Sequence, residues 1–292
     1  MPQKGYLMTK EINLFEYLTA FSALRTNLSD FYLKTKSCRI FGSYDTEDKA
    51  RGLLLTESAA VPEILVLSAE NNDPAVKKEL IDGLAAALPE GTPLRYRIQS
   101  QSGDRALAEE CGFREESILN LFRTVGAGDE RLHETFREYE KMARFLEKRG
   151  YETISFDRLS EAARREIAEN PDGVFDDGLH PGVLMEEIRG TVSETLSFAT
   201  LKGGKVAAYT IVRSPDKKNV IFEIICVAEP EKKSGVFILP FLCSLHKMEE
   251  TGADKAFFAI YEQNKEALPL VRKRFSRLIV SESVQWNMIR SC

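Results

Sequence analysis

The chain has 292 residues, enough for two ordinary domains that each bury a hydrophobic core. Its 43% hydrophobic and 29% charged residues are typical of a soluble globular protein. The formal net charge of −5 argues against a general binder of nucleic acids or acidic membranes, because affinity for phosphate requires a basic surface.

The first half predicts alternating helices and strands. Apolar residues at helical spacing, among them Ile12 and Tyr17, predict an amphipathic helix over residues 9–27. Short apolar runs predict strands over residues 38–44, 50–56, 63–68, 94–99 and 118–123. Further helices are expected from Pro74 to about Leu88, capped by Asp73, and over residues 105–110.

The second half predicts a similar order of elements after a linker at residues 124–129, which hold two glycines and no apolar run. A charged helix is expected over residues 130–148, a second after the cap Ser160, a third from Ile238 to Gly252 and a last one after Asn264. Strands are expected over residues 151–156, 196–201, 206–213, 220–227 and 255–261. Gly203 and Gly204 predict a hairpin turn between two of these strands.

The turn that joins strand 220–227 to the next helix is a candidate binding site. The start of a helix leaves backbone N–H groups unpaired and carries partial positive charge, and both favour a phosphate. Gly235 would let the backbone approach an anion closely, while Lys232 and Lys233 add positive charge. The simpler alternative is a solvated loop with two surface lysines.

This stretch resembles the GNAT superfamily of acyltransferases, which bind acyl coenzyme A (acyl-CoA). The family signature has a strand ending in Val, a Pro in the loop, and then Arg/Gln-x-x-Gly-x-Gly/Ala opening a long helix. Val227, Pro230, Lys232 and Gly235 match it in that order. A later family pattern, Asn-x-x-Ala-x-x-Leu-Tyr, is matched by Asn264, Ala267 and Leu270.

Several positions depart from the family pattern. Phe237 stands where a small residue usually lets the diphosphate approach, and Val271 replaces the family's tyrosine. Pro240 falls within the first turns of the helix, where it would remove a hydrogen bond or force a later start. In the first half, residues 107–113 resemble the family's ending, but the matching turn at residues 69–73 has no glycine and no basic residue.

The resemblance implies an α/β (α+β) fold with two GNAT-like domains, each a mixed, mostly antiparallel central sheet flanked by helices. Residues 1–126 are expected to form a degenerate domain without a diphosphate site. Residues 127–292 are expected to form the acyl-CoA-binding domain, which starts with the connecting helix at about 130–148. Acetyl-CoA or another acyl-CoA is the expected co-substrate. Its expected contacts are the backbone of Val227, Ser234, Gly235 and Val236, and the side chains of Lys232, Lys233 and Asn264.

Acyl transfer from a thioester to an amine requires a base for the amine and a proton for the leaving thiolate. Glu223 lies within the apolar run of the strand before the turn and is the candidate base; a solvent-facing position or a structural pair with an arginine is the alternative. Tyr261, at the end of the next strand, could supply the proton in place of the tyrosine lost at Val271, or be a structural tyrosine. For Asn264 the alternative is a helix cap.

Residues 170–194 are less regular, and in the superfamily this region lies over the acceptor pocket. The candidate acceptor contacts are Asp172, Asp176, Asp177, His180, Glu186 and Glu187, with an acidic surface loop as the alternative. The expected acceptor is a small amine or an amino-acid-like metabolite. The first domain is expected to serve packing, homodimer formation or the shaping of the acceptor side.

The cysteines, the histidines and the length of the apolar stretches argue against further kinds of site and compartment. Five widely spaced cysteines without a Cys-x-x-Cys pair, and three scattered histidines, predict neither a disulfide framework nor a metal site. No apolar stretch approaches the roughly 20 residues that span a bilayer, and no signal-peptide core follows Met1, so the cytoplasm is the expected compartment. The alternative to an enzyme is a non-catalytic binding or scaffolding module that retains the fold.

Overall fold

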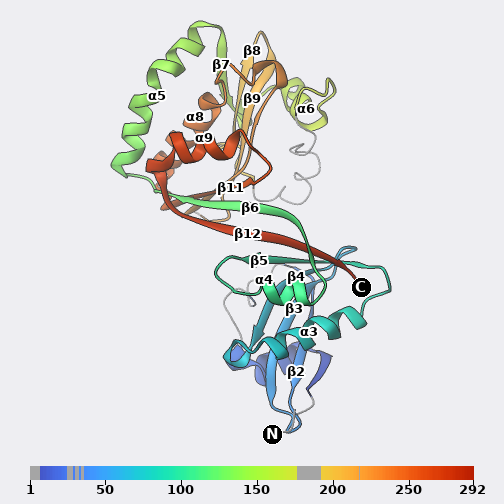
Figure 1. Cartoon of the computed structure of the whole chain (residues 1–292). Helices are drawn as coiled ribbons and strands as arrows, with labels where there is room; N and C mark the ends of the chain where they lie inside the picture. The colour runs from blue at the N-terminus through green and yellow to red at the C-terminus, as the bar shows by residue number, and fades with distance from the viewer. Residues whose placement is uncertain (1–6, 25–28, 30–32, 34–35, 176–191, 217) are drawn as a thin grey trace. The chain divides into compact units, whose positions relative to one another are not determined.

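A computed structural model describes the chain except for residues 1–6, 25–28, 30–32, 34–35, 176–191 and 217 (Figure 1). The chain divides into two compact units. Unit 1 comprises Met1–Leu119, Tyr261–Gln263 and Ser283–Cys292, and unit 2 comprises Asn120–Ile260 and Asn264–Glu282. The last ten residues therefore lie in the same unit as the first hundred.

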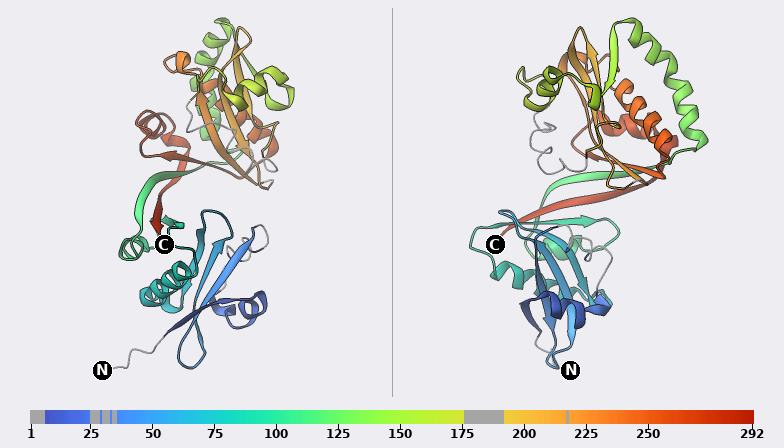
Figure 2. Two further views of the ribbon diagram at one scale, coloured as in Figure 1. Left: turned by 90° about the vertical axis from the view of Figure 1, so that its right-hand side faces the viewer. Right: turned by 180° about the vertical axis from the view of Figure 1, so that it is seen from behind.

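Unit 1 is a mixed sheet with helices on both faces. Its first strands and helices are β1 (Met8–Ile12), α1 (Leu14–Thr19), β2 (Cys38–Tyr44), β3 (Ala50–Glu57), β4 (Glu63–Ala69), α3 (Pro74–Ala86), β5 (Pro93–Gln99) and α4 (Arg105–Glu110). The strand order is β1-β2-β3-β4-β5-β12-β6, where β6 (Arg114–Thr124) and β12 (Ile279–Ser291) each continue into unit 2. Helices α3 and α4 cover one face and α1 the other (Figure 2).

The prediction of one helix over residues 9–27 was wrong. Residues 8–12 form strand β1, which pairs antiparallel with β2 from Met8↔Tyr44 to Ile12↔Ile40. Asn13 then starts α1 through a capping box, because its Oδ1 accepts the N–H of Glu16 and its own N–H donates to the Glu16 carboxylate. A cap at Asn13 ends any helix that would begin at residue 9.

Unit 2 has the same architecture. Its elements are α5 (Glu130–Lys148), β7 (Tyr151–Ser155), α6 (Glu161–Glu169), β8 (Phe198–Lys202), β9 (Lys205–Arg213), β10 (Asn219–Val227), α8 (Ile238–Thr251), β11 (Lys255–Tyr261) and α9 (Ala267–Arg274). The strand order is β7-β8-β9-β10-β11-β6-β12. Figure 1 shows α5, α8 and α9 on one side of this sheet and α6 on the other.

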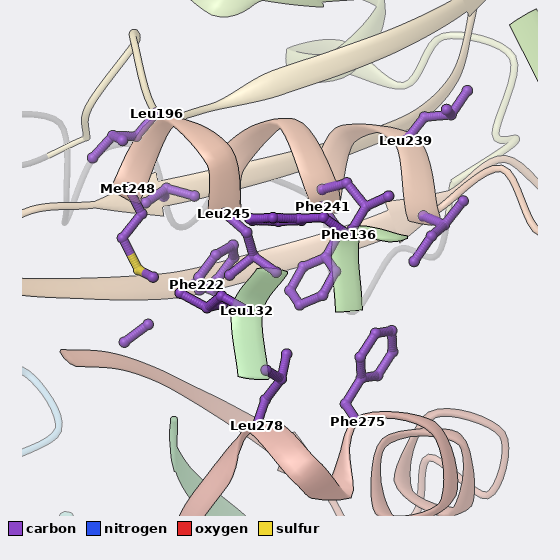
Figure 3. Packing of buried hydrophobic residues seen from close by; sticks show 14 of the residues in the cluster. Leu132, Phe136, Leu196, Phe222, Leu239, Phe241, Leu245, Met248, Phe275 and Leu278 are labelled. Atoms are coloured by element: carbon purple, nitrogen blue, oxygen red, sulfur yellow. The ribbon is translucent and has the colours of Figure 1, made fainter. Parts of the chain in front are cut away.

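The core on the α8 side fixes where that helix begins. Leu132 and Phe136 of α5 pack with Leu245 and Met248 of α8 and with residues around Phe275 (Figure 3). Rings add contacts, with Phe241 5.3 Å from Phe222 and 5.1 Å from Phe275 between centroids. Val236 and Ile238, at the start of α8, are both fully buried in this cluster. Burial of these two residues thus fixes the C-terminal end of the turn that precedes α8.

Pro240 does not disturb α8. The helix begins at Ile238, so Pro240 lies within the first turn, where the backbone N–H groups have no intrahelical acceptor. The helix ends as predicted at Gly252, whose φ is +70°. Helix α8 therefore forms directly after the turn, as the sequence predicts.

Candidate acyl-CoA site in unit 2

Strands β10 and β11 pair only over their first halves. Their parallel register runs from Asn219↔Lys255 to Phe222↔Phe258, while β10 continues to Val227 with β9 still paired at Val227↔Ala208. Among the described residues, the edge of β10 over residues 223–227 therefore has no partner strand on the β11 side. Such a splay leaves backbone groups available to a ligand.

A β-bulge lies at the point where the two strands separate. The register between β10 and β9 shifts between Phe222 and Ile224, so Glu223 is the extra residue. Before the bulge Phe222 faces the α8 side, whereas after it Ile224 faces the α6 side. The bulge thus places the one acidic residue of β10 where the strand changes face.

The carboxylate of Glu223 is held by an arginine. Arg213 Nε of β9 donates to Glu223 Oε1 at 2.5 Å, and both side chains are about a quarter exposed, at 28% and 22%. The structural pair with an arginine, one of the two alternatives for Glu223, is present. The residual exposure leaves the carboxylate within reach of a small molecule.

The N–H of Val227 points toward the unpaired edge. The N–H of Ala228 donates to the carbonyl of Ala207 at 2.9 Å, on the β9 side. Neighbouring residues of an antiparallel strand direct their N–H groups to opposite edges, so the Val227 N–H is directed away from β9. An acceptor on that side of β10 could therefore reach this N–H.

The turn after β10 is built around Ser234. Its N–H and its hydroxyl both donate to the carbonyl of Glu231, at 2.9 and 2.7 Å, and its Oγ accepts the N–H of Val236 at 3.1 Å. Gly235 has a φ of +77°, which favours glycine. Within the described part of the chain, the N–H groups of Lys233, Gly235 and Phe237 donate no hydrogen bond. Three alternate amides of the turn are open to an acceptor.

The charges around this turn sum to a small positive excess. Lys232 pairs with Glu229 at 2.5 Å, and Lys202 pairs with Glu231 at 2.9 Å. Lys233 is exposed and has no ion pair among the residues that the structure describes. Three ammonium groups therefore face two carboxylates, and Lys233 is the cation available to an anion.

Phe237 and Gly235 both pack against neighbours in unit 2. The Phe237 ring is partly buried against the α8-side core, 6.5 Å from the Phe275 ring and nearly perpendicular to it. A Cβ on Gly235 would lie 2.1 Å from Met142 Cε of α5. The bulky residue at the family's small position thus contributes to the core, and the glycine allows close packing of α5.

The other predicted residues have mostly structural contacts. Asn264 Oδ1 accepts the N–H of Ala267 at 2.9 Å, which is the capping role named as its alternative. Tyr261 is 47% exposed at the end of β11 and falls in unit 1. Asp172 is exposed and pairs with Lys205 at 3.4 Å. The remaining acceptor candidates, Asp176, Asp177, His180, Glu186 and Glu187, lie outside the described residues.

The corresponding turn of unit 1 is closed by its own side chains. Strands β4 and β5 also pair only at Glu63↔Arg95 and Ile64↔Tyr96, so the splay is repeated. The Glu70 carboxylate after β4 accepts from Lys49 at 3.1 Å and lies 2.9 Å from Arg51 Nε, and Asp73 Oδ1 accepts the N–H of Ala75. An acidic group and a cap occupy the place where an anion would bind.

The sequence did not indicate several residues that shape this site. Arg213, Tyr151 and Lys202 lie on strands distant in sequence from the turn, and their contacts with Glu223 and Glu231 depend on the sheet order. No local motif marks them. Tyr151 and Arg213 fall on predicted strands, where polar character is their only signal, and Lys202 falls in the predicted hairpin turn.

A separate open hollow of about 480 Å³ lies over α5 and α8. It is lined by Glu130, His133, Phe136, Arg137 and His246. The His246 ring stacks on Phe136 with centroids 3.6 Å apart, and burial lowers the pKa of His246. Among the described residues, no group of three or more His, Cys, Asp or Glu could hold a metal ion, and no helix is long and apolar enough to cross a membrane.

The splayed parallel strands, the turn and helix that follow, and their repetition define a tandem GNAT fold. No family model matches the sequence, and no curated protein matches it. Among solved structures, the chain is similar to a GCN5-related glucosamine N-acetyltransferase region of a fungal multi-domain GH3 β-N-acetylglucosaminidase. The TM-score is 0.66 at 11% identity, over 99% of this chain and 38% of that one.

Two further structures match along nearly their whole length. One is a tandem GNAT protein from the clavulanic acid biosynthesis pathway, with a TM-score of 0.61, 12% identity and 98% coverage of both chains. The other is a GCN5-related N-acetyltransferase from Sphaerobacter thermophilus, with a TM-score of 0.61, 10% identity, and coverage of 98% of this chain and 95% of that one. At identities of 10–12%, the structural similarity to these proteins shows that the chain has the same fold.

Proposed function

We propose that the protein is an acyl-CoA-dependent N-acyltransferase, with unit 2 as its catalytic half and acetyl-CoA or a related acyl-CoA as its donor. The observation that carries this proposal is the turn at residues 233–237, whose three open amides follow the splayed end of β10. Backbone N–H groups at the start of a helix are suited to a diphosphate. The closed turn of unit 1 supports a single donor site.

The chemistry requires few groups. The amine nitrogen of the acceptor attacks the thioester carbonyl carbon, whose oxygen the Val227 N–H would stabilise, and the C–S bond then breaks. Glu223 would take the proton from the amine, and water would supply the proton to the leaving thiolate. The expected acceptor is a small amine or amino-acid-like molecule, for which the partly exposed Glu223–Arg213 pair offers one acidic and one basic contact.

Lys233→Glu tests the donor site better than a change at Gly235. Any side chain at Gly235 would be strained at its φ of +77° and would meet Met142, so lost binding would be ambiguous. Lys233 is exposed, and reversing its charge removes the available cation and adds repulsion. We expect its Kd for acetyl-CoA, measured by calorimetry, to rise by about tenfold or more at low salt.

Lys255→Glu is the matched control, since it makes the same charge change at the start of β11, away from the turn. It is expected to bind acetyl-CoA as the wild type does. An equal loss of acetyl-CoA affinity in both variants would indicate a general charge effect. If the wild type gives no binding heat with acetyl-CoA, propionyl-CoA or free CoA, the proposal that the protein is an acyl-CoA-dependent enzyme is wrong.

A non-catalytic binding or scaffolding module is the second candidate. It is favoured by the ion pair between Glu223 and Arg213 and by the use of Asn264 as a helix cap, since both leave these side chains with structural partners. Release of free thiol from acetyl-CoA in the presence of a panel of small amines separates the two. CoA binding without any turnover would support the module.

A further inference from the structure

Glu231 lies directly before the turn and joins it to the far edge of the sheet in unit 2. Its Oε2 accepts the hydroxyl of Tyr151 from β7 at 2.5 Å, and its Oε1 accepts Lys202 Nζ from β8 at 2.9 Å. Lys202 Nζ also donates to the Tyr151 hydroxyl at 3.0 Å and lies 4.7 Å from the centre of that ring. Each member of this triad contacts both others.

The main chain of Glu231 continues the connection into the turn. Its carbonyl accepts both the N–H and the hydroxyl of Ser234, and Ser234 Oγ in turn accepts the N–H of Val236. Every second amide, at residues 234 and 236, is thereby used internally. The amides between them, at Lys233, Gly235 and Phe237, are left without acceptors in the described structure.

We infer that Glu231 is a positioning residue for the donor, which holds the turn so that its open amides meet the diphosphate of acyl-CoA. The inference rests on the proposed function. Preorganised donors bind an anion without paying to order the backbone, so a side chain that fixes the turn contributes affinity without touching the ligand.

The triad also explains how a carboxylate can lie beside a diphosphate site. An unpaired carboxylate there would repel the ligand, but Lys202 neutralises Glu231 and Tyr151 donates to it. Burial opposes ionisation, yet the hydrogen bonds from Tyr151 and Lys202 outweigh it, and the pKa of Glu231 is lowered. Glu231 therefore stays a carboxylate that accepts both bonds.

Comparing the affinities of two ligands distinguishes an effect on the diphosphate site from a general loss of stability. Acetyl-CoA carries the diphosphate, whereas S-acetylpantetheine has the same thioester and arm without it. In Glu231→Gln the Kd for acetyl-CoA, measured by NMR titration, is expected to rise about tenfold, because the amide weakens charge-assisted bonds that hold the turn. The Kd for S-acetylpantetheine is expected to stay within about twofold.

Tyr151→Phe is the milder variant, which removes one hydroxyl while the ring stays; about a threefold rise with the same selectivity is expected. Glu229→Gln is the matched control, since it makes the same change at a nearby glutamate that is 69% exposed and that pairs with Lys232 among the described residues. Unchanged affinity of Glu231→Gln for acetyl-CoA, or equal losses for both ligands, would overturn the inference. A wild type that binds both ligands equally, or neither, would overturn the proposed diphosphate site itself.

Discussion

Lys77 is a charged residue in the interior of unit 1. Its Nζ lies 2.6 Å from Asp104 Oδ1, and the hydroxyl of Tyr96 donates to Asp104 Oδ2 at 2.8 Å. The side chains of Lys77 and Asp104 are only 5% and 9% exposed, and burial next to Asp104 raises the pKa of Tyr96. The three residues join α3, β5 and the start of α4.

Lys77→Met should lower the free energy of unfolding of unit 1 by about 3–5 kcal/mol, because it leaves the Asp104 carboxylate buried without its counter-ion. Adding Asp104→Leu should recover part of this loss, since no unpaired charge then remains. The single tryptophan, Trp286, belongs to unit 1, so its fluorescence during urea denaturation reports on this unit. Losses that simply add in the double variant would show that the two charges are not coupled.

Helices α5 and α8 contact each other through a histidine stacked on a phenylalanine. Burial lowers the pKa of His246, and the neighbouring His133 acts in the same direction, against the opposing effect of Glu249 and Glu250. Glu130 and Arg137 also line this surface. A lowered pKa means that the unfolded chain binds a proton at His246 more readily than the folded one.

Unit 2 should therefore become less stable as the pH falls from 7.5 toward 5.5. The stability that neutral His246 contributes is fully present above the ordinary histidine pKa of about 6.5, and it is lost as the pH falls toward the lowered pKa of the folded state. In His246→Gln this part of the pH dependence should disappear. Urea midpoints from circular dichroism at several pH values measure it, and His133→Gln, which removes only the smallest of the contributions to the pKa of His246, should keep most of the pH dependence. Parallel curves for wild type and His246→Gln would contradict the assignment.

Elements with strong local signals were predicted well from the sequence. α5 lies between the cap Asp129 and Gly150 and has the expected bounds, as do α4, β2 and β11. The hairpin turn has Gly203 and Gly204 with φ of +58° and +83°, as its chemistry requires. β1 was missed because its apolar residues also fit a helical spacing, and β12 because no element was assigned after residue 275.

The candidate site was predictable only where the family signature is local. The position of the turn, Gly235 and Glu223 follow from a contiguous stretch of sequence. The bulge at Glu223, its bond to Arg213 and the contacts of Glu231 with β7 and β8 depend on how distant strands pair. Side-chain contacts of that kind are set by the tertiary structure, and single-residue patterns do not encode them.

At the scale of the whole molecule, two strands, β6 and β12, are each divided between the two units. Arg114–Leu119 of β6 belong to unit 1 and the rest of β6 to unit 2, while β12 lies in unit 2 up to Glu282 and in unit 1 from Ser283. The terminal part of β12 pairs with β5 from Gln285↔Gln99 to Ser291↔Pro93. The fold of unit 1 thus depends on residues 283–292, which lie far from the rest of that unit in the sequence.

Removal of residues 283–292 should destabilise unit 1 more than unit 2. It takes away the pairing with β5, the bonds between Cys292 and residues 91 and 92, and Met288, which is only 1% exposed in the unit 1 core. Hydrogen exchange should show faster exchange in β3, β5 and α3 and nearly unchanged exchange in β9 and α8. Met288→Ala, in the full chain, should cost unit 1 about 2–5 kcal/mol.

Val280→Ala is the control within the same strand, because Val280 is 46% exposed and lies in the unit 2 part of β12. It should leave exchange in unit 1 unchanged. If the truncated chain keeps full protection in β3 and β5, residues 1–126 form a self-sufficient domain, as the sequence predicts. If protection is lost and returns on adding a peptide of residues 283–292, the last strand is an integral part of the first domain, and an expressed fragment ending at residue 126 would lack it.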